Sequence, residues 1–196
     1  MISHIEGLIT EKTPTYVVID CNGVGYSMNI SLNTYSKITA LQTCKLLTEQ
    51  VYVRDDLPRF YGFIEGAERN LFRQLISVSG VGGTSAIMML SSLSSAEIQD
   101  AIVSGNVTLL KSIKGIGEKT AQRIIVDLKG KLGKDILGTD FLNSSNNTLK
   151  EEALSALQML GFAKNMADKA IDKALKIGGN TQTIEQVIKL ALRNLS

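Results

Sequence analysis

Two short turns bounded by glycines, Gly80-Val81-Gly82 and Gly115-Ile116-Gly117, are the parts of this chain best suited to binding chemistry. They belong to an internal repeat in which residues 75–86 match residues 110–121 at a constant offset of 35 positions. The two copies share a leucine, a serine, both glycines and an alanine. Repetition at this spacing indicates one supersecondary unit that is used twice. In each copy we expect one helix to end, a tight turn to follow and a second helix to begin.

Such a turn is suited to binding phosphate. Glycines let a nucleic-acid strand approach the backbone closely, and the amide N–H groups that begin the second helix point outward with the positive end of its dipole. The apolar residue between the glycines is expected to pack back into the core. Contacts of this kind address the sugar-phosphate backbone and carry no base information. The predicted DNA-binding residues are Gly80, Val81, Gly82, Gly83 and Thr84 in the first copy and Lys114, Gly115, Ile116, Gly117, Lys119, Thr120 and Arg123 in the second.

The distribution of charge supports an anion-binding segment, although the net charge of the chain is only +2. Residues 1–62 carry five Lys or Arg against six Asp or Glu, whereas residues 111–134 carry seven against two. Lys114, Lys119 and Arg123 flank the second turn, where phosphates would lie.

Other phosphate-binding motifs do not fit these turns. In a Walker A loop, Ser112 would occupy the position of the first glycine and Glu118 that of the lysine. A dinucleotide fingerprint needs a third glycine, where Ser85 or Thr120 stands, and a preceding strand. The remaining alternative is that the glycines only end helices; two copies in register with basic neighbours favour binding.

The elements around the turns predict an α+β multidomain chain. Short β-branched and aromatic runs at 16–19, 26–30 and 51–53, with a turn at Asn22-Gly23, indicate about five strands in a small barrel that is compatible with an oligonucleotide-binding (OB) type. From Glu65 the apolar period becomes helical, and Ser94 with Glu97 predicts a capping box. Asn106 is the expected cap of the next helix.

A polar segment over 138–147 predicts a flexible linker. Three cap pairs follow, Thr148 with Glu151, Asn165 with Asp168 and Thr183 with Gln186, and predict a C-terminal three-helix bundle. Gly161 and Gly178-Gly179 are the expected helix stops. The predicted domains are a barrel over 1–63, an all-α domain with two helix-hairpin-helix motifs over 64–137, the linker over 138–147 and a UBA-like bundle over 148–196.

The chain offers little for metal or membrane chemistry. Cys21 and Cys44 lack metal-ligand spacing, and His4 is the single histidine, so we expect no metal, no cofactor and two reduced thiols. No apolar run approaches the roughly 20 residues of a membrane span, and no export signal is visible, so a cytoplasmic location without membrane partners is expected.

The order of barrel, paired hairpins, linker and helical bundle resembles the RuvA family, the Holliday junction-binding subunits of the bacterial RuvAB branch-migration complex. The resemblance covers essentially the whole chain. The segments that carry it are Gly23-Val24-Gly25-Tyr26, Val53-Arg54-Asp55-Asp56, Phe60-Tyr61-Gly62-Phe63, the two glycine turns with Glu118-Lys119-Thr120-Ala121, and residues 156–162.

The resemblance implies a non-catalytic role in recombination and DNA repair. It implies a homotetramer that holds an open four-way junction, one duplex arm per subunit, and allows a second tetramer on the other face to make an octamer. Asp55 and Asp56 resemble an acidic pin whose charge repels phosphates at the crossover. The resemblance further implies that the bundle docks on the hexameric ATPase RuvB, and that the RuvC resolvase is a partner. The docking residues carried over are Leu157, Leu160, Phe162 and Leu192, of which Phe162 is expected to be the most exposed.

The chain departs from the family pattern at Gly83-Thr84, where Pro-Lys is usual, so the first hairpin loses a cation and some stiffness. His4 and Glu6 also stand where more basic residues are common. Two other function classes remain open: a DNA repair enzyme, such as a nuclease or glycosylase, that uses the hairpins for positioning, and a protein-interaction scaffold without a DNA function.

Overall fold

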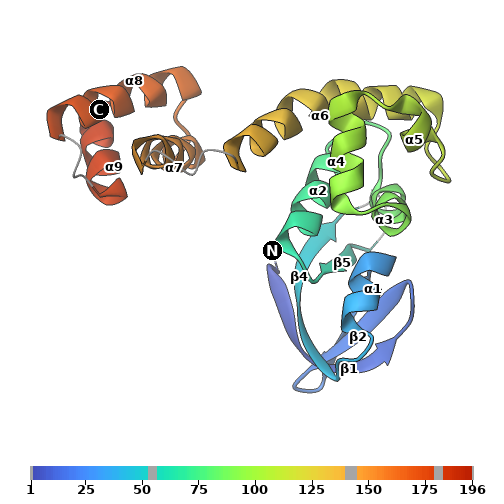
Figure 1. Cartoon of the computed structure of the whole chain (residues 1–196). Coiled ribbons are helices and arrows are strands. Elements are labelled where there is room, and N and C mark those ends of the chain that lie inside the picture. The colour runs from blue at the N-terminus through green and yellow to red at the C-terminus, as the bar shows by residue number, and fades with distance from the viewer. Residues whose placement is uncertain (1, 53–56, 140–144, 179–182, 196) are drawn as a thin grey trace. The chain divides into compact units, whose positions relative to one another are not determined.

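The computed structural model describes residues 2–52, 57–139, 145–178 and 183–195 (Figure 1). It divides into two compact units, Met1–Leu137 and Gly138–Ser196. The first unit contains the barrel and the paired hairpins, and the second contains a helical bundle. In the described residues, no helix is long and apolar enough to cross a membrane.

A closed five-stranded barrel forms the N-terminal part, as the alternating sequence predicts. The strands are β1 (His4–Lys12), β2 (Tyr16–Cys21), β3 (Val24–Asn29), β4 (Thr43–Val51) and β5 (Arg59–Phe63), and α1 (Leu32–Ile38) lies between β3 and β4 in the chain. The order around the barrel is β1-β2-β3-β5-β4, with β3 and β5 parallel and the other four pairs antiparallel. Full closure pairs every strand on both sides, so the barrel has no free edge.

Local sequence explains why the barrel closes in this register. Val17 and Ile19 alternate with more exposed residues on β2 and are fully buried. The β2–β3 turn places Asn22 at φ 54° and Gly23 at φ 89°, the left-handed pair that a two-residue hairpin requires. The prediction of an OB-type barrel is confirmed.

Five helices follow the barrel in the chain: α2 (Gly66–Ile76), α3 (Gly83–Ser92), α4 (Ser95–Ser104), α5 (Val107–Lys111) and α6 (Glu118–Thr139). The capping box is confirmed, since the Ser94 N–H donates to Glu97 Oε2 at 2.8 Å and the Glu97 N–H donates to Ser94 Oγ at 3.3 Å. Asn106 Oδ1 accepts from the Leu109 N–H at 3.0 Å, which confirms the second expected cap.

The barrel and the helices share a polar seam. Glu68 of α2 is only 2% exposed, and its carboxylate accepts hydrogen bonds from the Ser31 hydroxyl and, at 2.8 Å, from Thr34 Oγ1. Because a buried carboxylate is costly unless it is hydrogen-bonded, these contacts fix α2 against α1. Asn33 of α1 also contacts the helices, since its Nδ2 donates to the carbonyl of Leu90 at 2.6 Å. This hydrogen bond joins the C-terminal half of α3 to α1.

The second unit is a three-helix bundle of α7 (Ser145–Met159), α8 (Lys164–Gly178) and α9 (Ile184–Arg193), as predicted. Two predicted helix starts are wrong. Helix α7 begins at Ser145, before the expected cap Thr148, and α8 begins at Lys164, one residue before the expected cap Asn165. Helix ends fray, and a cap-like residue inside the first turn gives the same sequence signal as a true cap. The predicted linker over 138–147 overlaps the ends of α6 and α7, and residues 140–144 lie outside the described part of the chain.

Gly161 has φ 94°, as a helix stop requires, and the Phe162 N–H donates to the carbonyl of Leu157 at 3.1 Å. The backbone N–H of Thr183 donates to Gln186 Oε1 at 3.1 Å, as expected of the last cap pair.

Candidate nucleic-acid interface

The two glycine turns have the same backbone geometry. Gly80 has φ 92° and Gly115 has φ 90°, values that only glycine adopts without strain. In each copy the next residue donates its N–H to the carbonyl three positions back, at 3.0 Å. The carbonyl of the second glycine then accepts the first helical hydrogen bond, Ala86 N–H to Gly82 at 3.0 Å and Ala121 N–H to Gly117 at 2.9 Å. The prediction of one unit used twice is therefore confirmed.

Val81 and Ile116 pack inward, as the sequence predicts. Their side chains are only 5% and 4% exposed and belong to the apolar core shared by α2 to α6. This anchoring fixes each turn, because the apolar residue cannot leave the core without losing its burial.

The second glycine of each turn has no internal reason to be glycine. A Cβ added at Gly82 or Gly117 would meet no atom within 4 Å. Gly82 has φ −93° and ψ 171°, an extended conformation that any residue adopts. Both residues are exposed, so the missing side chains leave the first turns of α3 and α6 open to solvent. The fold would therefore accept a side chain at either position.

Gly83 differs from the other predicted residues of the first turn. It is buried, and a Cβ on it would lie 2.5 Å from Cζ and 2.8 Å from Cε2 of Tyr61. A side chain at this position would require the Tyr61 ring to shift, a packing contact that was not predicted when Gly83 was assigned to the DNA-binding residues and described as a departure that costs stiffness. Thr84 is exposed in the first turn of α3, and Thr120 is half-buried in α6.

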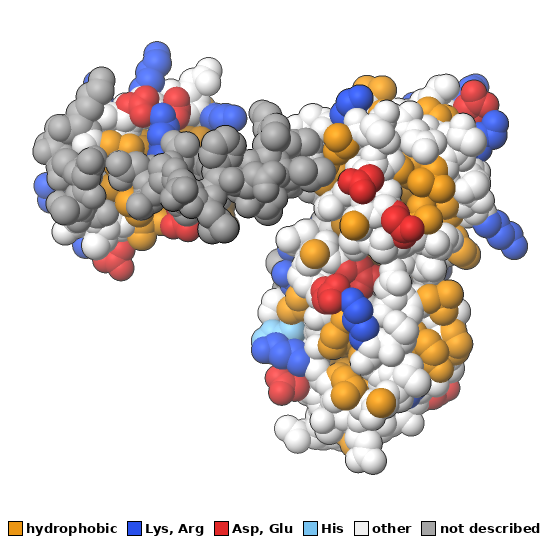
Figure 2. All heavy atoms as spheres, viewed as in Figure 1, with side chains coloured by type: hydrophobic (Ala, Val, Ile, Leu, Met, Phe, Trp, Pro, Cys, Tyr) orange, Lys and Arg blue, Asp and Glu red, His pale blue; other side chains and the backbone are white. Residues whose placement is uncertain are grey.

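Lys114, Lys119 and Arg123 are exposed around the second turn. Lys114 and Lys119 have no hydrogen-bond or ionic partner among the described residues. Arg123 reaches across to the first turn, where its Nη1 donates to the carbonyl of Ser79 at 3.2 Å. Lysine and arginine side chains extend from the end of the unit where α5 meets α6 (Figure 2). The structure thus brings the predicted cations of the second hairpin together and links one of them to the first.

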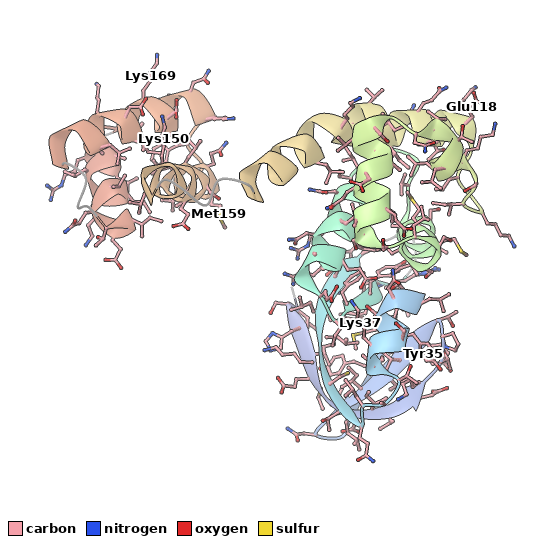
Figure 3. The ribbon with its side chains drawn as sticks, in the orientation of Figure 1. Tyr35, Lys37, Glu118, Lys150, Met159 and Lys169 are labelled. Atoms are coloured by element: carbon pink, nitrogen blue, oxygen red, sulfur yellow. The ribbon has the colours of Figure 1, made fainter. Side chains whose placement is uncertain are left out.

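Glu118 is the acidic residue at this end of α6 (Figure 3). Its Oε2 lies 3.3 Å from Lys111 Nζ, and both side chains are more than half exposed. A carboxylate in the first turn of a helix is stabilised by the helix dipole. Its charge is offset by Lys111, which limits its repulsion of an anion at the turn.

The predicted acidic pin, Asp55 and Asp56, lies outside the described residues. On β1, His4 and Glu6 are both exposed, as expected of surface strand residues. Glu6 Oε2 lies 4.0 Å from Lys45 Nζ on the adjacent β4, an exposed pair of small energetic weight.

The predicted docking residues of the bundle divide between core and surface. Leu157 is fully buried, so its predicted place in an exposed patch is wrong, because it faces α8 and α9 in the bundle core. Phe162 and Leu192 are partly buried against that core, and Leu160, at 60% exposed, replaces Phe162 as the most exposed of the four.

Two exposed methionines of the bundle were not predicted as site residues. Met159 is 87% exposed on the outer side of α7 (Figure 3), and Met166 is 56% exposed on α8. Their exposure follows from the packing of the bundle, since Ala153 and Leu157 form the buried row of α7 and Met159 falls outside it. Flexible, polarisable methionines are common on surfaces that bind protein partners.

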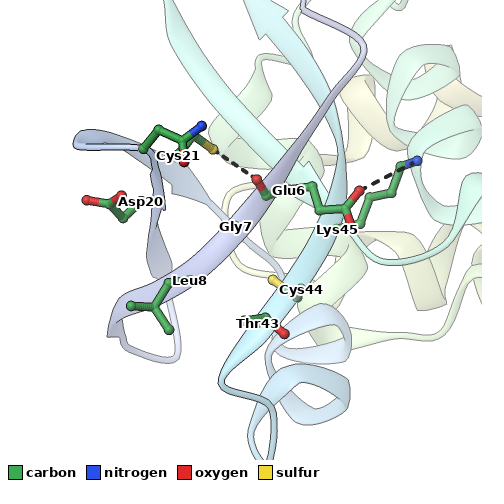
Figure 4. A pocket seen from close by; sticks show the side chains of 9 residues that line it. Glu6, Gly7, Leu8, Asp20, Cys21, Thr43, Cys44 and Lys45 are labelled. Atoms are coloured by element: carbon green, nitrogen blue, oxygen red, sulfur yellow. Dashed lines mark hydrogen bonds and ion pairs between the residues drawn. The ribbon is translucent and has the colours of Figure 1, made fainter.

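The two cysteines line one cavity of about 680 Å³ at the barrel surface, together with Glu6, Asp20 and Lys45 (Figure 4). Both thiols are free, and Cys21 Sγ donates to the carbonyl of Glu6 at 3.1 Å. Burial raises the pKa of the Cys44 thiol. A protonated thiol is a poor nucleophile and a poor metal ligand, so Cys44 acts as a small apolar core residue. Among the described residues, no three His, Cys, Asp or Glu side chains form a group that could hold a metal ion.

Comparison with known proteins gives the same arrangement of domains. The chain matches family models described as the RuvA N-terminal domain over residues 1–62, a SAM-like helix-hairpin-helix tandem over 72–130, and the RuvA C-terminal domain over 148–196. A protein from Christiangramia forsetii is 49% identical over 195 residues, and one from Flavobacterium psychrophilum is 48% identical over 196. One from Bacteroides fragilis is 47% identical over 203.

All three alignments cover 100% of both chains, and all three proteins are named Holliday junction branch migration complex subunit RuvA. The identity to these relatives is nearly one half over their full length, and the family models for the RuvA N-terminal and C-terminal domains match the two ends of the chain. The chain belongs to the RuvA family.

Proposed function

We propose that this chain binds four-way (Holliday) junction DNA by its structure rather than its sequence, as the DNA-binding subunit of a branch-migration complex. The observation that carries the proposal is the open space at Gly82 and Gly117, which the fold itself does not require. Amide donors at a helix N-terminus bind phosphate oxygens but do not distinguish bases. Two such turns in one unit bind a duplex arm at two places. The positive charges of Lys114 and Lys119 add electrostatic attraction for its phosphates.

We propose a homotetramer as the working form, with an octamer formed when two tetramers enclose one junction. Four identical arms meeting at a point present a fourfold ligand, and four identical subunits in a closed ring give each arm the same contacts. We further propose that Asp55 and Asp56 act as an acidic pin near the centre of this ring, where their negative charge would keep strands from settling at the crossover.

The bundle is proposed to recruit the RuvB ATPase. The exposed apolar side chains of Met159, Leu160 and Met166 on this small domain support this role, because exposed apolar side chains of this size are available to a protein partner. The subunit itself performs no chemistry in this scheme. It supports recombination and DNA repair by holding the junction for the motor and for the RuvC resolvase.

The test is a gel-shift titration of the full chain with labelled four-way junctions of two unrelated sequences and with linear duplexes of the same sequences. We expect equal affinity for the two junctions, a strong preference for junction over duplex, and affinity that falls steeply with salt. Equal affinity for junction and duplex would refute the proposal.

A second incubation with Mg²⁺ separates the repair-enzyme alternative. Intact strands are expected, whereas specific strand cleavage or base release would favour an enzyme that uses the hairpins for positioning.

A further inference from the structure

The first hairpin carries no basic side chain at its glycine turn. Residues 74–110, which run from the end of α2 to the penultimate residue of α5, contain no Lys or Arg. The basic residue just before this stretch, Arg73, pairs with Glu49 of β4, whose Oε2 lies 2.5 Å from Arg73 Nε. The second turn, by contrast, has Lys114 and Lys119 beside it. A cation for the first turn must therefore come from another element.

Arg123 of α6 reaches the first turn from the second hairpin. Its Nη1 donates to the carbonyl of Ser79 at 3.2 Å, and Ser79 directly precedes Gly80. A guanidinium carries five N–H donors in a planar fork, and this hydrogen bond uses one of them. Ser79, Gly80 and Gly82 are all exposed, as is Arg123 itself. The remaining donors are therefore accessible to an anion that approaches the first turn from solvent.

The internal repeat shows that the two hairpins do not share this arrangement. Helices α3 and α6 begin 35 positions apart, at 83 and 118, so Met88 of α3 aligns with Arg123. Met88 is 39% exposed, and its thioether cannot donate a hydrogen bond. In the turns themselves, Lys114 aligns with Ser79. The second turn therefore has its own lysine, whereas the first has a serine whose carbonyl holds an arginine from the other hairpin.

We infer that the phosphate site at the first turn is composite: its amide donors come from the start of α3, and its cation is Arg123 of the second hairpin. The inference rests on the proposed function, since these amides are the ones that we propose bind phosphate. The hydrogen bond to Ser79 holds the guanidinium beside the turn before DNA binds, which reduces the entropy lost when a long side chain is ordered. Charge-assisted hydrogen bonds are about twice as strong as neutral ones, so this one arginine compensates for the uncharged turn.

The test is a double-mutant cycle that asks which turn Arg123 serves. Arg123→Gln removes the cation, while Gly82→Asn and Gly117→Asn each place an uncharged side chain at one turn, where the fold has open space. Lys119→Gln is the matched control, because Lys119 is an exposed cation on the same helix beside the second turn. Junction affinities of the four single variants and the four pairs are measured at a temperature where circular dichroism shows each variant fully folded.

Arg123→Gln should weaken junction binding by about tenfold, the order expected when one charge-assisted hydrogen bond is lost. The loss should be the same in the Gly117→Asn background but should shrink to less than about threefold in the Gly82→Asn background, because only residues that share a contact are non-additive. Lys119→Gln should show the reverse pattern. Its effect should shrink with Gly117→Asn and persist with Gly82→Asn.

A second measurement reports on the bridge without DNA. The carbonyl of Ser79 and the N–H of Gly80 belong to one peptide group, so loss of the hydrogen bond in Arg123→Gln should move the Gly80 amide resonance of the free chain. Lys119→Gln should leave that resonance in place.

The inference is overturned if Arg123→Gln loses the same affinity in both glycine backgrounds, if its effect shrinks only with Gly117→Asn, or if the Gly80 resonance does not move. Failure of the proposed function looks different. A parent chain that does not prefer junctions refutes that function, and the same cycle on linear duplex then still shows which turn Arg123 serves. A parent chain that binds no DNA overturns both.

Discussion

Replacing Gly82 by aspartate should separate stability from DNA binding, because the two effects have opposite signs. Gly82 is the N-cap of α3, its backbone is extended, and a side chain there meets nothing within 4 Å. Aspartate is among the best N-cap residues, and its charge is favourable at a helix N-terminus by about 0.3–1 kcal/mol. Gly82→Asp should therefore leave the free energy of unfolding unchanged or slightly raised.

The same carboxylate should block phosphate. It would accept the amide N–H groups that we propose DNA uses, and each charge-assisted hydrogen bond lost costs about 1.5–3 kcal/mol. A phosphate about 4 Å from the carboxylate is also repelled by about 1 kcal/mol in water and about 4 kcal/mol at the dielectric of a protein surface. The sum is at least about 2.5 kcal/mol, which corresponds to a loss of junction affinity of more than about 50-fold.

The assay is a junction titration paired with thermal unfolding of the same samples. Gly82→Asn is the matched variant of similar shape without the charge, and it should lose less affinity than Gly82→Asp. Asn22→Asp, in the β2–β3 turn, makes the same change in net charge away from the hairpins and should bind almost normally. A folded Gly82→Asp protein that binds the junction within a few-fold of the parent would refute the reasoning.

Three further predictions concern other parts of the chain. Arg123→Gln should weaken junction binding and lower the slope of log affinity against log salt concentration by about 0.9. Weaker binding at an unchanged slope would mean that Arg123 only stabilises the first turn through its hydrogen bond to Ser79. Hydrogen bonds from the backbone and hydroxyl of Ser94 lower the pKa of Glu97 below its ordinary 4.5, so the stability they provide is present above pH 4.5 and lost as pH falls through the lower folded pKa. Ser94→Ala should therefore reduce stability at pH 7 more than at pH 3 in urea unfolding, and an equal loss at both would contradict this. Deletion of 148–196 should spare junction binding and abolish stimulation of the RuvB ATPase; loss of junction binding would contradict that division of roles.

Much of the fold could be predicted because its signals are local. The left-handed turns at Asn22-Gly23 and the positive φ of Gly80 and Gly115 follow from residues that tolerate them. The capping box at Ser94 is equally local, since cap and partner lie three residues apart. The repeat added a second, independent signal, because two copies in register predict the same turn twice.

The rest could not be predicted because it depends on contacts between distant segments. Nothing near Gly83 in the sequence shows that the ring of Tyr61 lies where its Cβ would be, so the packing of this residue against the barrel could not be predicted. Leu157 and Leu160 are three residues apart near a helix end, where periodicity does not say which one faces the core. Only the packing of α8 and α9 decides this.

Amide chemical shifts of the isotope-labelled full chain, recorded with and without a four-way junction, test most directly whether the paired turns supply main-chain donors to DNA. The account predicts that the largest changes fall on the first turns of α3 and α6, at 82–84 and 117–119, and recur with a junction of unrelated sequence. Large changes confined to the barrel or to 148–196, with both turns unmoved, would contradict it.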